Sequence, residues 1–395
     1  MPENKIYIAA AGSGKTTFII EQVKGMLRNA QDCAKKIFVI TYTQNNQENI
    51  IRRFQTIYGN MPNKVIVIGW FSFLLDYWIR PFKGTVIESL YDRHVGLIMT
   101  EQISGVKTNS NGTHWTTYKN DTEKFLCKNG SKLYSDKLSE FAYRCWEKNK
   151  GTLLSRLFEI TDTIFIDEAQ DLVAWDFEII KLLMQKSNVK CVLCGDPRQH
   201  TFSTSPSSKN KNYAGDIARY AKEKINGMRK QYVIIDNNTL IKSHRCVDAI
   251  CSFASQITPS FPKTETCECT KCITDRQNYK LPHGLFLLRE QDVQSYVNIY
   301  NPISLVWDKN VPLLSDTETT LNWGSSKGLQ FDASIIYLTQ PVKNFLRSIQ
   351  TNLTNNTRNK FYVALTRAKF AVALVVPNDF DNNKSNLPFW EETLI

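Results

Sequence analysis

The stretch IYIAAAGSGKTT, residues 6–17, decides the fold of the first part of the chain. It begins with the apolar run Ile6–Ala9, which predicts a strand, and leads into a helical pattern over Phe18–Met26. A glycine-rich turn that ends in Lys-Thr between a strand and a helix predicts a phosphate-binding P-loop. Backbone N–H groups of such a turn surround the phosphates, the lysine reaches the β and γ oxygens, and the hydroxyl binds Mg²⁺. The residues expected to bind ATP are Ala11, Gly12, Ser13, Gly14, Lys15, Thr16 and Thr17.

A second phosphate-related element is the run IFIDEAQD at residues 164–171. Its apolar β-forming residues end in two adjacent carboxylates, Asp167 and Glu168, as Mg²⁺-assisted phosphoryl transfer requires. We predict that Asp167 holds Mg²⁺ together with Thr16. Glu168 is expected to polarise the attacking water. The alternative is a strand that ends in a solvated acidic turn, and the accompanying P-loop argues against it.

The composition indicates a globular protein with a basic surface. The 395 residues, 42% of them hydrophobic, are enough for two or three domains. The net charge is +11, and residues 198–230 carry eight Lys/Arg against two acids. This excess favours a polyanionic partner, nucleic acid first, over a solvated basic face without a partner. Because the P-loop strand starts at residue 6 and no apolar run is long enough for a bilayer, we expect no signal peptide, no membrane contact and a cytoplasmic location.

Strands and helices alternate along the chain, which predicts an α/β fold with parallel sheets. The strands expected first are Ile6–Ala9, Ile37–Thr41, Lys64–Ile68, Ile164–Ile166, Cys191–Cys194 and Tyr232–Ile235. A later series comprises Leu285–Leu288, Ile303–Trp307, Ser334–Leu338 and Phe370–Val376. The domains predicted from this pattern are a first one at 1–81 and 157–235, a small subdomain inserted in it at 82–156, and a second one at 236–395 with a short Cys-rich loop near 262–282.

The Cys-rich loop contains Cys267, Cys269 and Cys272, three of the ten cysteines of the chain. Such a group suits a zinc knuckle, for which His283 or Cys251 would have to supply the fourth ligand. The spacing is irregular, so a loop of reduced thiols is favoured over a zinc site. Other cysteines lie in apolar strands, where they are expected to be small reduced core residues.

Eight short motifs, in the same order and over nearly the whole chain, resemble those of superfamily 1 helicases of the UvrD/Rep type. They are residues 9–16 (AAAGSGKT), 37–44 (IFVITYTQ), 69–73 (GWFSF), 164–171 (IFIDEAQD), 192–202 (VLCGDPRQHTF), 243–246 (SHRC), 324–332 (GSSKGLQFD) and 358–369 (RNKFYVALTRAK). The resemblance implies two RecA-like P-loop domains, with ATP and Mg²⁺ in the cleft between them and single-stranded DNA across the top.

The resemblance also implies roles for residues outside the P-loop. Arg245 and Arg367 are expected to reach the γ-phosphate from the second domain, since the charge that develops in phosphoryl transfer needs a cation there. Gln199 is expected to contact the γ-phosphate or the attacking water. The alternative for each arginine is a surface salt bridge. Three further residues implied at the nucleotide are His244, which stands where the family has an adenine-stacking tyrosine, Gly328, and Gln330, which replaces the usual glutamate.

Single-stranded DNA binding in this family uses aromatic side chains that stack on bases and cations that neutralise the backbone. The residues that the resemblance brings to DNA are Thr41, Tyr42, Thr43, Trp70, Phe202 and Lys327. Core packing is the alternative for the aromatic residues.

Two departures from the family pattern concern its accessory parts. The upstream Gln motif that contacts adenine has no room before the P-loop, so relaxed base selectivity is expected. Only residues 247–323 separate the SHRC and GSSKGLQFD motifs, which leaves out the large accessory subdomain. The resemblance therefore implies a minimal form of the motor.

Three functions are compatible with these patterns. The first is an ATP-dependent translocase or helicase on single-stranded DNA, or on DNA with a single-stranded tail, and the resemblance implies 3′→5′ movement. The second is a DNA-stimulated ATPase that assists a partner such as a nuclease, in phage defence or DNA repair, with little unwinding alone. The third is a P-loop kinase or small-molecule NTPase, which predicts no stimulation by DNA.

Overall fold

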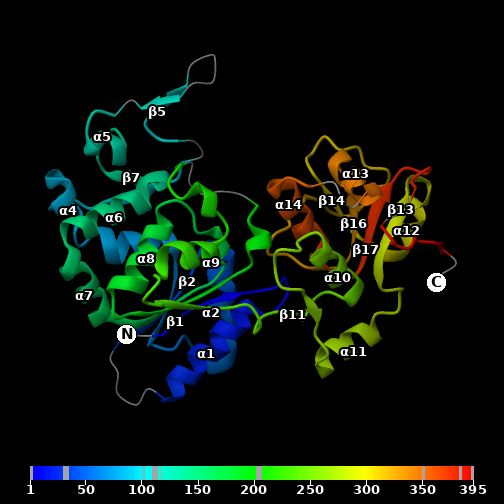
Figure 1. Ribbon diagram of the computed structural model, residues 1–395, viewed down its shortest axis with the longest axis horizontal. Coiled ribbons are helices and arrows are strands. Elements are labelled where there is room, and N and C mark those ends of the chain that lie inside the picture. Colours follow the sequence, from blue (N-terminus) through cyan, green and yellow to red (C-terminus); the bar gives the residue numbers. More distant parts are fainter. Residues whose placement is uncertain are drawn as a thin grey trace. The chain divides into compact units, whose positions relative to one another are not determined.

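A computed structural model of the chain describes residues 3–29, 35–100, 103–108, 114–116, 118–201, 207–348, 352–381 and 385–392. The chain divides into two units. Unit 1 consists of Met1–Ile8, Lys15–Pro197 and Ser203–Asp236, and unit 2 consists of Ala9–Gly14, Arg198–Phe202 and Asn237–Ile395. In Figure 1 the large sheet of unit 1 is built from blue and green strands, and that of unit 2 from yellow to red ones.

Parallel strands form the large sheet of unit 1, in the order β10-β1-β9-β8-β2-β3. Their bounds are β1 Asn4–Ile8, β2 Lys36–Thr41, β3 Val65–Gly69, β8 Thr161–Ile166, β9 Lys190–Gly195 and β10 Val233–Asp236. The run Ile37–Ile40 in β2 is apolar throughout and buried, as expected for a strand that is covered on both faces. Every strand that the sequence predicts for the first domain is present.

Helices connect the strands of this sheet. They are α1 Lys15–Asn29, α2 Gln44–Tyr58, α8 Asp176–Lys186 and α9 Ile217–Tyr220, the last of which continues as a π-helical turn over Ala221–Ile225. Helix α2 illustrates why they form. The Oγ1 atom of Thr43 accepts the N–H of Asn46 at 3.2 Å and caps the start of the helix, while Ile50 and Phe54 on one face are buried.

The segment between β3 and β8 contains residues 82–156, for which an inserted subdomain is predicted. Its elements are α3 Trp70–Phe73, a π-helical turn Leu74–Ile79, α4 Lys83–Val86, β4 Gly96–Ile98, β5 Val106–Thr108, β6 His114–Thr116, α5 Asp121–Phe125, β7 Lys132–Tyr134, α6 Leu138–Lys148 and α7 Lys150–Ile160. Strands β4 and β7 pair with each other, and β5 and β6 form a small antiparallel pair. Phe125, Leu133 and Phe141 belong to the same buried cluster as Phe38 of β2, so the insertion shares the core of the sheet.

Unit 2 contains a second parallel sheet, in the order β13-β17-β16-β14-β15. The bounds of its strands are β13 Gly284–Arg289, β14 Ile303–Val306, β15 Thr320–Asn322, β16 Phe331–Tyr337 and β17 Ala368–Val376. Its helices are α10 Asp248–Gln256, α11 Thr270–Asn278, α12 Val293–Tyr300, α13 Gln340–Ser348 and α14 Asn355–Leu365. A separate parallel pair is formed by the short strands β11 Lys242–Ser243 and β12 Glu265–Thr266, which the sequence pattern does not indicate.

Each unit is thus a parallel sheet accompanied by helices, and the prediction of two RecA-like α/β domains is confirmed. The carboxyl ends of parallel strands lie at one edge of their sheet, where ligands of such folds bind. In the part of the chain that the structure describes, no helix has both the length and the apolar character needed to cross a bilayer.

Candidate nucleotide site

The glycine-rich turn lies directly between β1, which ends at Ile8, and α1, which begins at Lys15. Gly12 has a φ of +73°, a backbone conformation that other residues rarely adopt. A Cβ atom on Gly12 would also lie 2.6 Å from Cβ of Arg245 and 2.8 Å from Oγ of Ser243. The turn therefore requires glycine at this position, both for its conformation and for the close approach of the segment around Arg245.

Four predicted side chains meet at the start of α1 and the end of β8, within unit 1. The Thr16 hydroxyl donates a hydrogen bond of 2.6 Å to Oδ2 of Asp167. Nζ of Lys15 lies 3.5 Å from Oε1 of Glu168. The lysine and the hydroxyl of the P-loop thus contact the two carboxylates that follow β8, although more than 150 residues separate the P-loop from these carboxylates in the sequence.

The backbone at Glu168 is held in an uncommon conformation. Its φ is 57°, in the left-handed region, and its N–H donates to Oδ1 of Asp167 at 2.9 Å. The Gln170 side chain donates to the Glu168 carboxylate and accepts the N–H of Asp196 at 2.9 Å. A non-glycine residue at positive φ persists only where its surroundings determine it, and such strain gathers at functional positions.

The electrostatics of the acidic pair suit a divalent cation. Burial, followed by repulsion from Glu168, raises the pKa of Asp167 to about 6, while Lys15 and the Thr16 hydroxyl act to lower this pKa. The Asp167 carboxyl is therefore ionised at neutral pH but poorly compensated. A bound Mg²⁺ would supply the missing positive charge, and a hydroxyl with a carboxylate is a donor set that Mg²⁺ accepts.

The other predicted phosphate-directed residues belong to unit 2. Arg367 is only 1% exposed; its guanidinium donates to the backbone oxygens of Val363, at 3.1 Å, and Leu329, and to Oε1 of Gln199 at 3.2 Å. Arg245 donates through Nη1 to the backbone oxygen of Thr366 at 2.9 Å. Arg367 and Gln199, which were assigned to the γ-phosphate separately, are thus bonded to each other. The burial of Arg367 excludes the alternative of a surface salt bridge for this residue.

Two residues of unit 2 that were not predicted from the sequence, Arg198 and Tyr362, form hydrogen bonds with the backbone of the glycine-rich turn. Arg198 is buried and donates to the backbone oxygen of Ala9 at 2.8 Å, with its guanidinium against the ring of Tyr362. The hydroxyl of Tyr362 accepts the N–H of Ala11 at 3.3 Å. Arg198 was counted as part of a basic surface segment. Its place directly after a Gly-Asp-Pro turn at a strand end was the signal that could have identified it.

The family pattern also implies that His244, Gly328 and Gln330 contact the nucleotide. The backbone N–H of His244 donates to the oxygen of Gly12 at 2.9 Å, which places this residue beside the P-loop turn. Its imidazole, however, lies among cysteine side chains, with Nδ1 3.6 Å from Sγ of Cys272. Gly328 and Gln330 are exposed in the loop between β15 and β16.

The structure corrects two of the residues expected at DNA. Trp70 is 1% exposed, and its indole N–H donates to Oδ1 of Asp176 at 2.7 Å. Thr41 is fully buried at the end of β2. Neither side chain offers a surface to a base or a phosphate. The core-packing alternative holds for Trp70, because burial of a large ring and of its polar N–H with a carboxylate partner stabilises the unit.

The other expected DNA contacts keep accessible atoms. Thr43 is exposed, and Tyr42 and Lys327 are half-buried. Phe202 lies outside the described residues. The hydroxyl of Tyr42 donates to Oδ2 of Asp176 at 2.6 Å, so one end of this ring is anchored in the unit.

Two substitutions of Tyr42 should separate its anchoring from base stacking. Tyr42→Phe removes a hydrogen bond to a buried carboxylate and is expected to lower the free energy of unfolding by about 1.5–3 kcal/mol, with little effect on affinity for single-stranded DNA. Tyr42→Ala should in addition weaken DNA binding by about 1–3 kcal/mol, because the stacking face is lost. Urea unfolding and fluorescence anisotropy with an oligonucleotide measure the two effects. Equal DNA affinities of both variants and the wild type would show that Tyr42 only supports the core.

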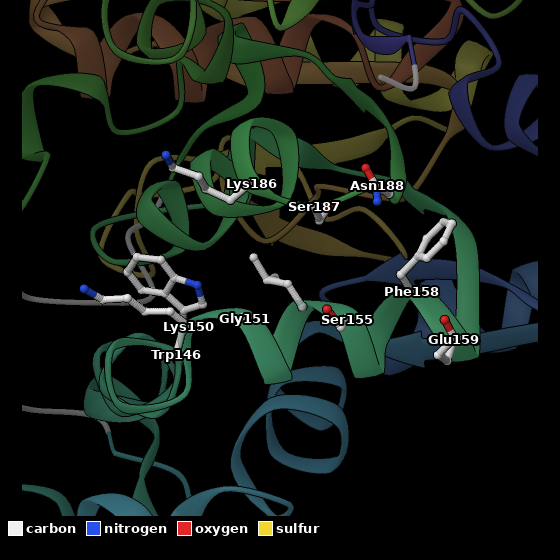
Figure 2. Close-up of a pocket in the computed structure, with 10 residues that line it drawn as sticks. Trp146, Lys150, Gly151, Ser155, Phe158, Glu159, Lys186, Ser187 and Asn188 are labelled. Carbon is white, nitrogen blue, oxygen red and sulfur yellow. The ribbon is translucent and has the colours of Figure 1, made fainter.

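A pocket of about 520 Å³ lies elsewhere in unit 1 (Figure 2). It is lined by residues of α6, α7, the end of α8 and the turn before β9: Trp146, Lys150, Gly151, Leu154, Ser155, Phe158, Glu159, Lys186, Ser187 and Asn188. Among these lining residues there is no carboxylate pair and no residue of the P-loop. The chemistry of phosphoryl transfer is therefore assigned to the turn and the acidic pair, and not to this pocket.

Two models of helicase families match this chain. The model of the UvrD/REP helicase N-terminal domain matches residues 2–90, and that of the viral superfamily 1 RNA helicase core domain matches residues 121–376, more than half of the chain. A search of curated proteins finds no match.

Among solved structures, two of arterivirus nonstructural protein 10, a helicase, are similar. The structure of the protein alone has a TM-score of 0.41 and 14% identity, covering 96% of this chain and 60% of that one. Its complex with DNA has a TM-score of 0.41 and 13% identity, covering 96% and 61%. The chain thus spans about three fifths of the length of these helicases. Given the extent of the family match and the P-loop and acidic pair that accompany it, this chain belongs to the viral superfamily 1 RNA helicase core family and is a superfamily 1 helicase.

Proposed function

We propose that this chain is an ATP-dependent motor that translocates on single-stranded DNA, or unwinds DNA with a single-stranded tail, in the 3′→5′ direction. One observation carries the proposal: Thr16 lies 2.6 Å from Asp167, and Lys15 lies 3.5 Å from Glu168. These are the four side chains that ATP hydrolysis with Mg²⁺ needs in a P-loop enzyme. The polarity and the choice of DNA rest on the resemblance to UvrD/Rep helicases.

Each of these side chains has a proposed task. Lys15 neutralises charge on the β- and γ-phosphates, and Thr16 and Asp167 would hold Mg²⁺. Glu168 orients and deprotonates the attacking water. Mg²⁺ when bound would polarise the phosphate oxygens, and the chain supplies the ligands and the base.

Arg367, Gln199 and Arg245 are proposed to act on the γ-phosphate. An arginine close to the transferring group stabilises the charge that develops there. The hydrogen bond between Arg367 and Gln199 supports a shared role, because movement of one side chain would change the position of the other. The N–H of His244 on Gly12 keeps the adjacent Arg245 beside the phosphate-binding turn.

The nucleic acid is proposed to be bound by cations and accessible aromatic side chains. The net charge of +11 supports a polyanionic partner, and Tyr42, Thr43 and Lys327 have accessible atoms. RNA is the second candidate, because the matching core family is described as one of RNA helicases.

The test is ATP hydrolysis without nucleic acid, with single-stranded DNA and with single-stranded RNA. Hydrolysis should rise with DNA, and DNA affinity should fall linearly on a log–log plot of salt, with a slope of about −0.7 for each phosphate neutralised. A larger rise with RNA at equal salt would move the assignment to RNA. A rate that is indifferent to both would contradict the motor and favour a small-molecule NTPase.

Strand displacement distinguishes a motor from a regulatory ATPase. Between α10 and β15 the described residues form β12, α11, β13, α12 and β14, and this short span supports a minimal motor that needs a partner to unwind efficiently. A duplex with a 3′ tail should be displaced in the presence of ATP, and one with a 5′ tail should not. Stimulated hydrolysis without displacement of either duplex would favour an ATPase that assists a partner such as a nuclease.

A further inference from the structure

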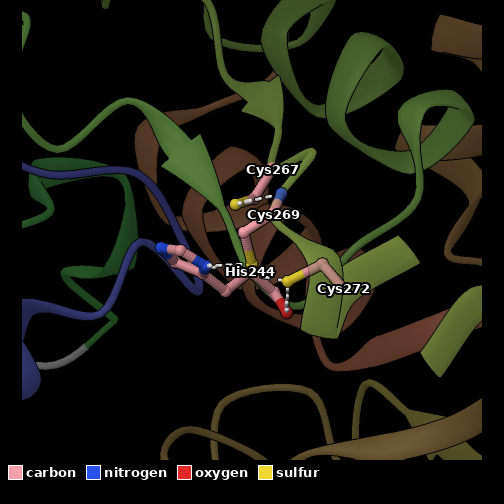
Figure 3. A group of neighbouring side chains, drawn as sticks. All are labelled: His244, Cys267, Cys269 and Cys272. Atoms are coloured by element: carbon pink, nitrogen blue, oxygen red, sulfur yellow. Dashed lines mark hydrogen bonds between the residues drawn. The ribbon is translucent and has the colours of Figure 1, made fainter. Parts of the chain in front are cut away.

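Four potential metal ligands converge in unit 2, on the short β11–β12 pair and the helix that follows it. Figure 3 shows the side chains of His244, Cys267, Cys269 and Cys272 directed toward one another. Their ligand atoms all lie within 4.8 Å of one another. Sγ of Cys272 is 3.6 Å from Nδ1 of His244, and Sγ of Cys269 is 4.0 Å from the same nitrogen.

The backbone explains why residues so distant in sequence meet. Ser243 pairs with Thr266 in the parallel β11–β12 ladder, so His244 and Cys267, which follow them, leave the two strands side by side. The N–H of Cys267 donates to the oxygen of Ser243 at 2.9 Å and fixes this register.

The other two ligands come from the start of α11. Cys269 occupies the N-cap position, and Cys272 lies in the first turn of the helix. Arg276, one turn later, donates to the backbone oxygen of Cys267 at 2.9 Å and ties the helix to the strand end. The N-terminus of a helix favours negative charge, and it therefore suits the thiolate ligands of a metal.

The arrangement fits Zn²⁺ better than other common metals. A tetrahedral Zn²⁺ with Zn–S distances of about 2.3 Å places its sulfurs about 3.8 Å apart. The ligand atoms here, all within 4.8 Å of one another, can surround such an ion. Three thiolates and an imidazole are soft and borderline ligands, which select zinc over Mg²⁺ or Ca²⁺. The N–H of Cys269 already donates to Sγ of Cys267 at 3.5 Å, the kind of outer contact that orients a metal ligand.

The fourth ligand differs from those considered on the sequence. Nε2 of His283 donates to the backbone oxygen of Tyr279 at 3.2 Å, and the imidazole lies against the ring of Phe370. Sγ of Cys251 is buried and bonded to the backbone oxygen of Cys246 at 3.6 Å. Neither belongs to the convergent group, whereas His244, which follows the neighbouring strand β11, supplies a nitrogen.

We propose that His244, Cys267, Cys269 and Cys272 bind one structural Zn²⁺. With four protein ligands, the coordination is closed and leaves no position for a substrate. The metal would cross-link β11, β12 and α11, where the β-ladder itself contains only two paired residues per strand. His244 is then a metal ligand, and its imidazole is not available to stack on adenine.

A consequence follows for the P-loop, and this part rests on the proposed function. The residue that binds the metal through its imidazole also donates its N–H to the oxygen of Gly12. Zinc would therefore fix the segment 243–245 against the phosphate-binding turn. Loss of the metal should loosen this contact and weaken nucleotide binding.

The test is the metal content of the full chain, purified without chelator and measured by elemental analysis. The wild type should contain one zinc per chain, and Co²⁺ added to the metal-free protein should give the visible absorption of tetrahedral cobalt with thiolate ligands. The variants His244→Gln and Cys269→Ser, both at exposed positions, should lose most of the zinc and change the cobalt spectrum. The matched controls His283→Gln and Cys127→Ser should retain the wild-type content, because neither residue belongs to the cluster.

Three results would overturn the site: no zinc and no tetrahedral cobalt spectrum in the wild type, an iron cluster in its place, or full zinc content in both ligand variants. Circular dichroism of the variants checks that loss of metal does not reflect global unfolding. Nucleotide affinity of His244→Gln, compared with that of His283→Gln, tests the link to the P-loop. A chain that holds zinc but hydrolyses no ATP would support the metal site and contradict the proposed function, so the two can fail separately.

Discussion

Glu168→Gln is expected to bind ATP and Mg²⁺ but to hydrolyse ATP about 10²–10⁴ times more slowly than the wild type. The substitution removes the carboxylate that would take a proton from water, and general-base catalysis contributes rate enhancements of this size. The proposed Mg²⁺ ligands Thr16 and Asp167, whose Oγ1 and Oδ2 atoms lie 2.6 Å apart, are retained. Single-turnover hydrolysis measures the chemical step, and calorimetric titration with ATP measures binding.

Two further substitutions make this result specific. Lys15→Ala should lose both binding and hydrolysis, because the lysine faces the β- and γ-phosphates in ground state and transition state alike. Glu159→Gln, at an exposed carboxylate of the pocket in Figure 2, should change neither. Wild-type turnover in Glu168→Gln would show that the acidic pair has been assigned the wrong roles.

The pair of contacts around Asp167 was predictable because it depends on topology. The strand before Asp167 and the strand before the P-loop are both apolar runs of a parallel sheet, and their carboxyl ends must lie at the same edge. The strands of both sheets except β15 were recognised for the same reason, since buried parallel strands have nearly continuous apolar sequences. The apolar sequence of each of these strands therefore agrees with its buried place in the sheet. Strand β15, with the sequence TLN, has no such run and was not predicted.

The environment of Trp70 could not be predicted from its motif. The indole N–H has its partner in Asp176, which lies 106 residues further along the chain. An aromatic residue at the start of a helix after a strand is equally compatible with a stacking platform and with a core position. Only the buried carboxylate, which also accepts from Tyr42, decides between them.

The metal cluster was missed in part for a related reason. Strands β11 and β12 contribute only two residues each to their ladder, too few for an alternating pattern to appear in the sequence. His244 was therefore assigned by its motif alone, and the candidates for a fourth ligand were His283 and Cys251. A parallel ladder of any length brings the residues after both strands together, whatever their separation in sequence.

Arg367→Ala is expected to lower kcat by about 10³–10⁵, while affinity for ATP changes much less. An arginine that reaches the γ-phosphate acts mainly on charge that develops during transfer, and such residues contribute rate factors of this size. The guanidinium is positioned by the backbone oxygens of Val363 and Leu329 and by Oε1 of Gln199, so its orientation is set before ATP is hydrolysed. Steady-state hydrolysis with saturating single-stranded DNA, together with nucleotide binding, measures the effect.

Because Arg367 is buried, its removal must be separated from damage to unit 2. Arg367→Lys keeps a positive charge but not the planar fork of the guanidinium. This variant should remain folded and should show most of the decrease in kcat that is expected for Arg367→Ala. Arg358→Ala, on the preceding helix α14 and half-buried, is the matched control and should hydrolyse ATP normally. Combining Arg367→Ala with Arg245→Ala should cost less than the sum of the two separate losses, because both arginines act on one developing charge. Normal DNA-stimulated turnover in a folded Arg367→Ala variant would mean that this arginine only packs unit 2, and the γ-phosphate would need another cation.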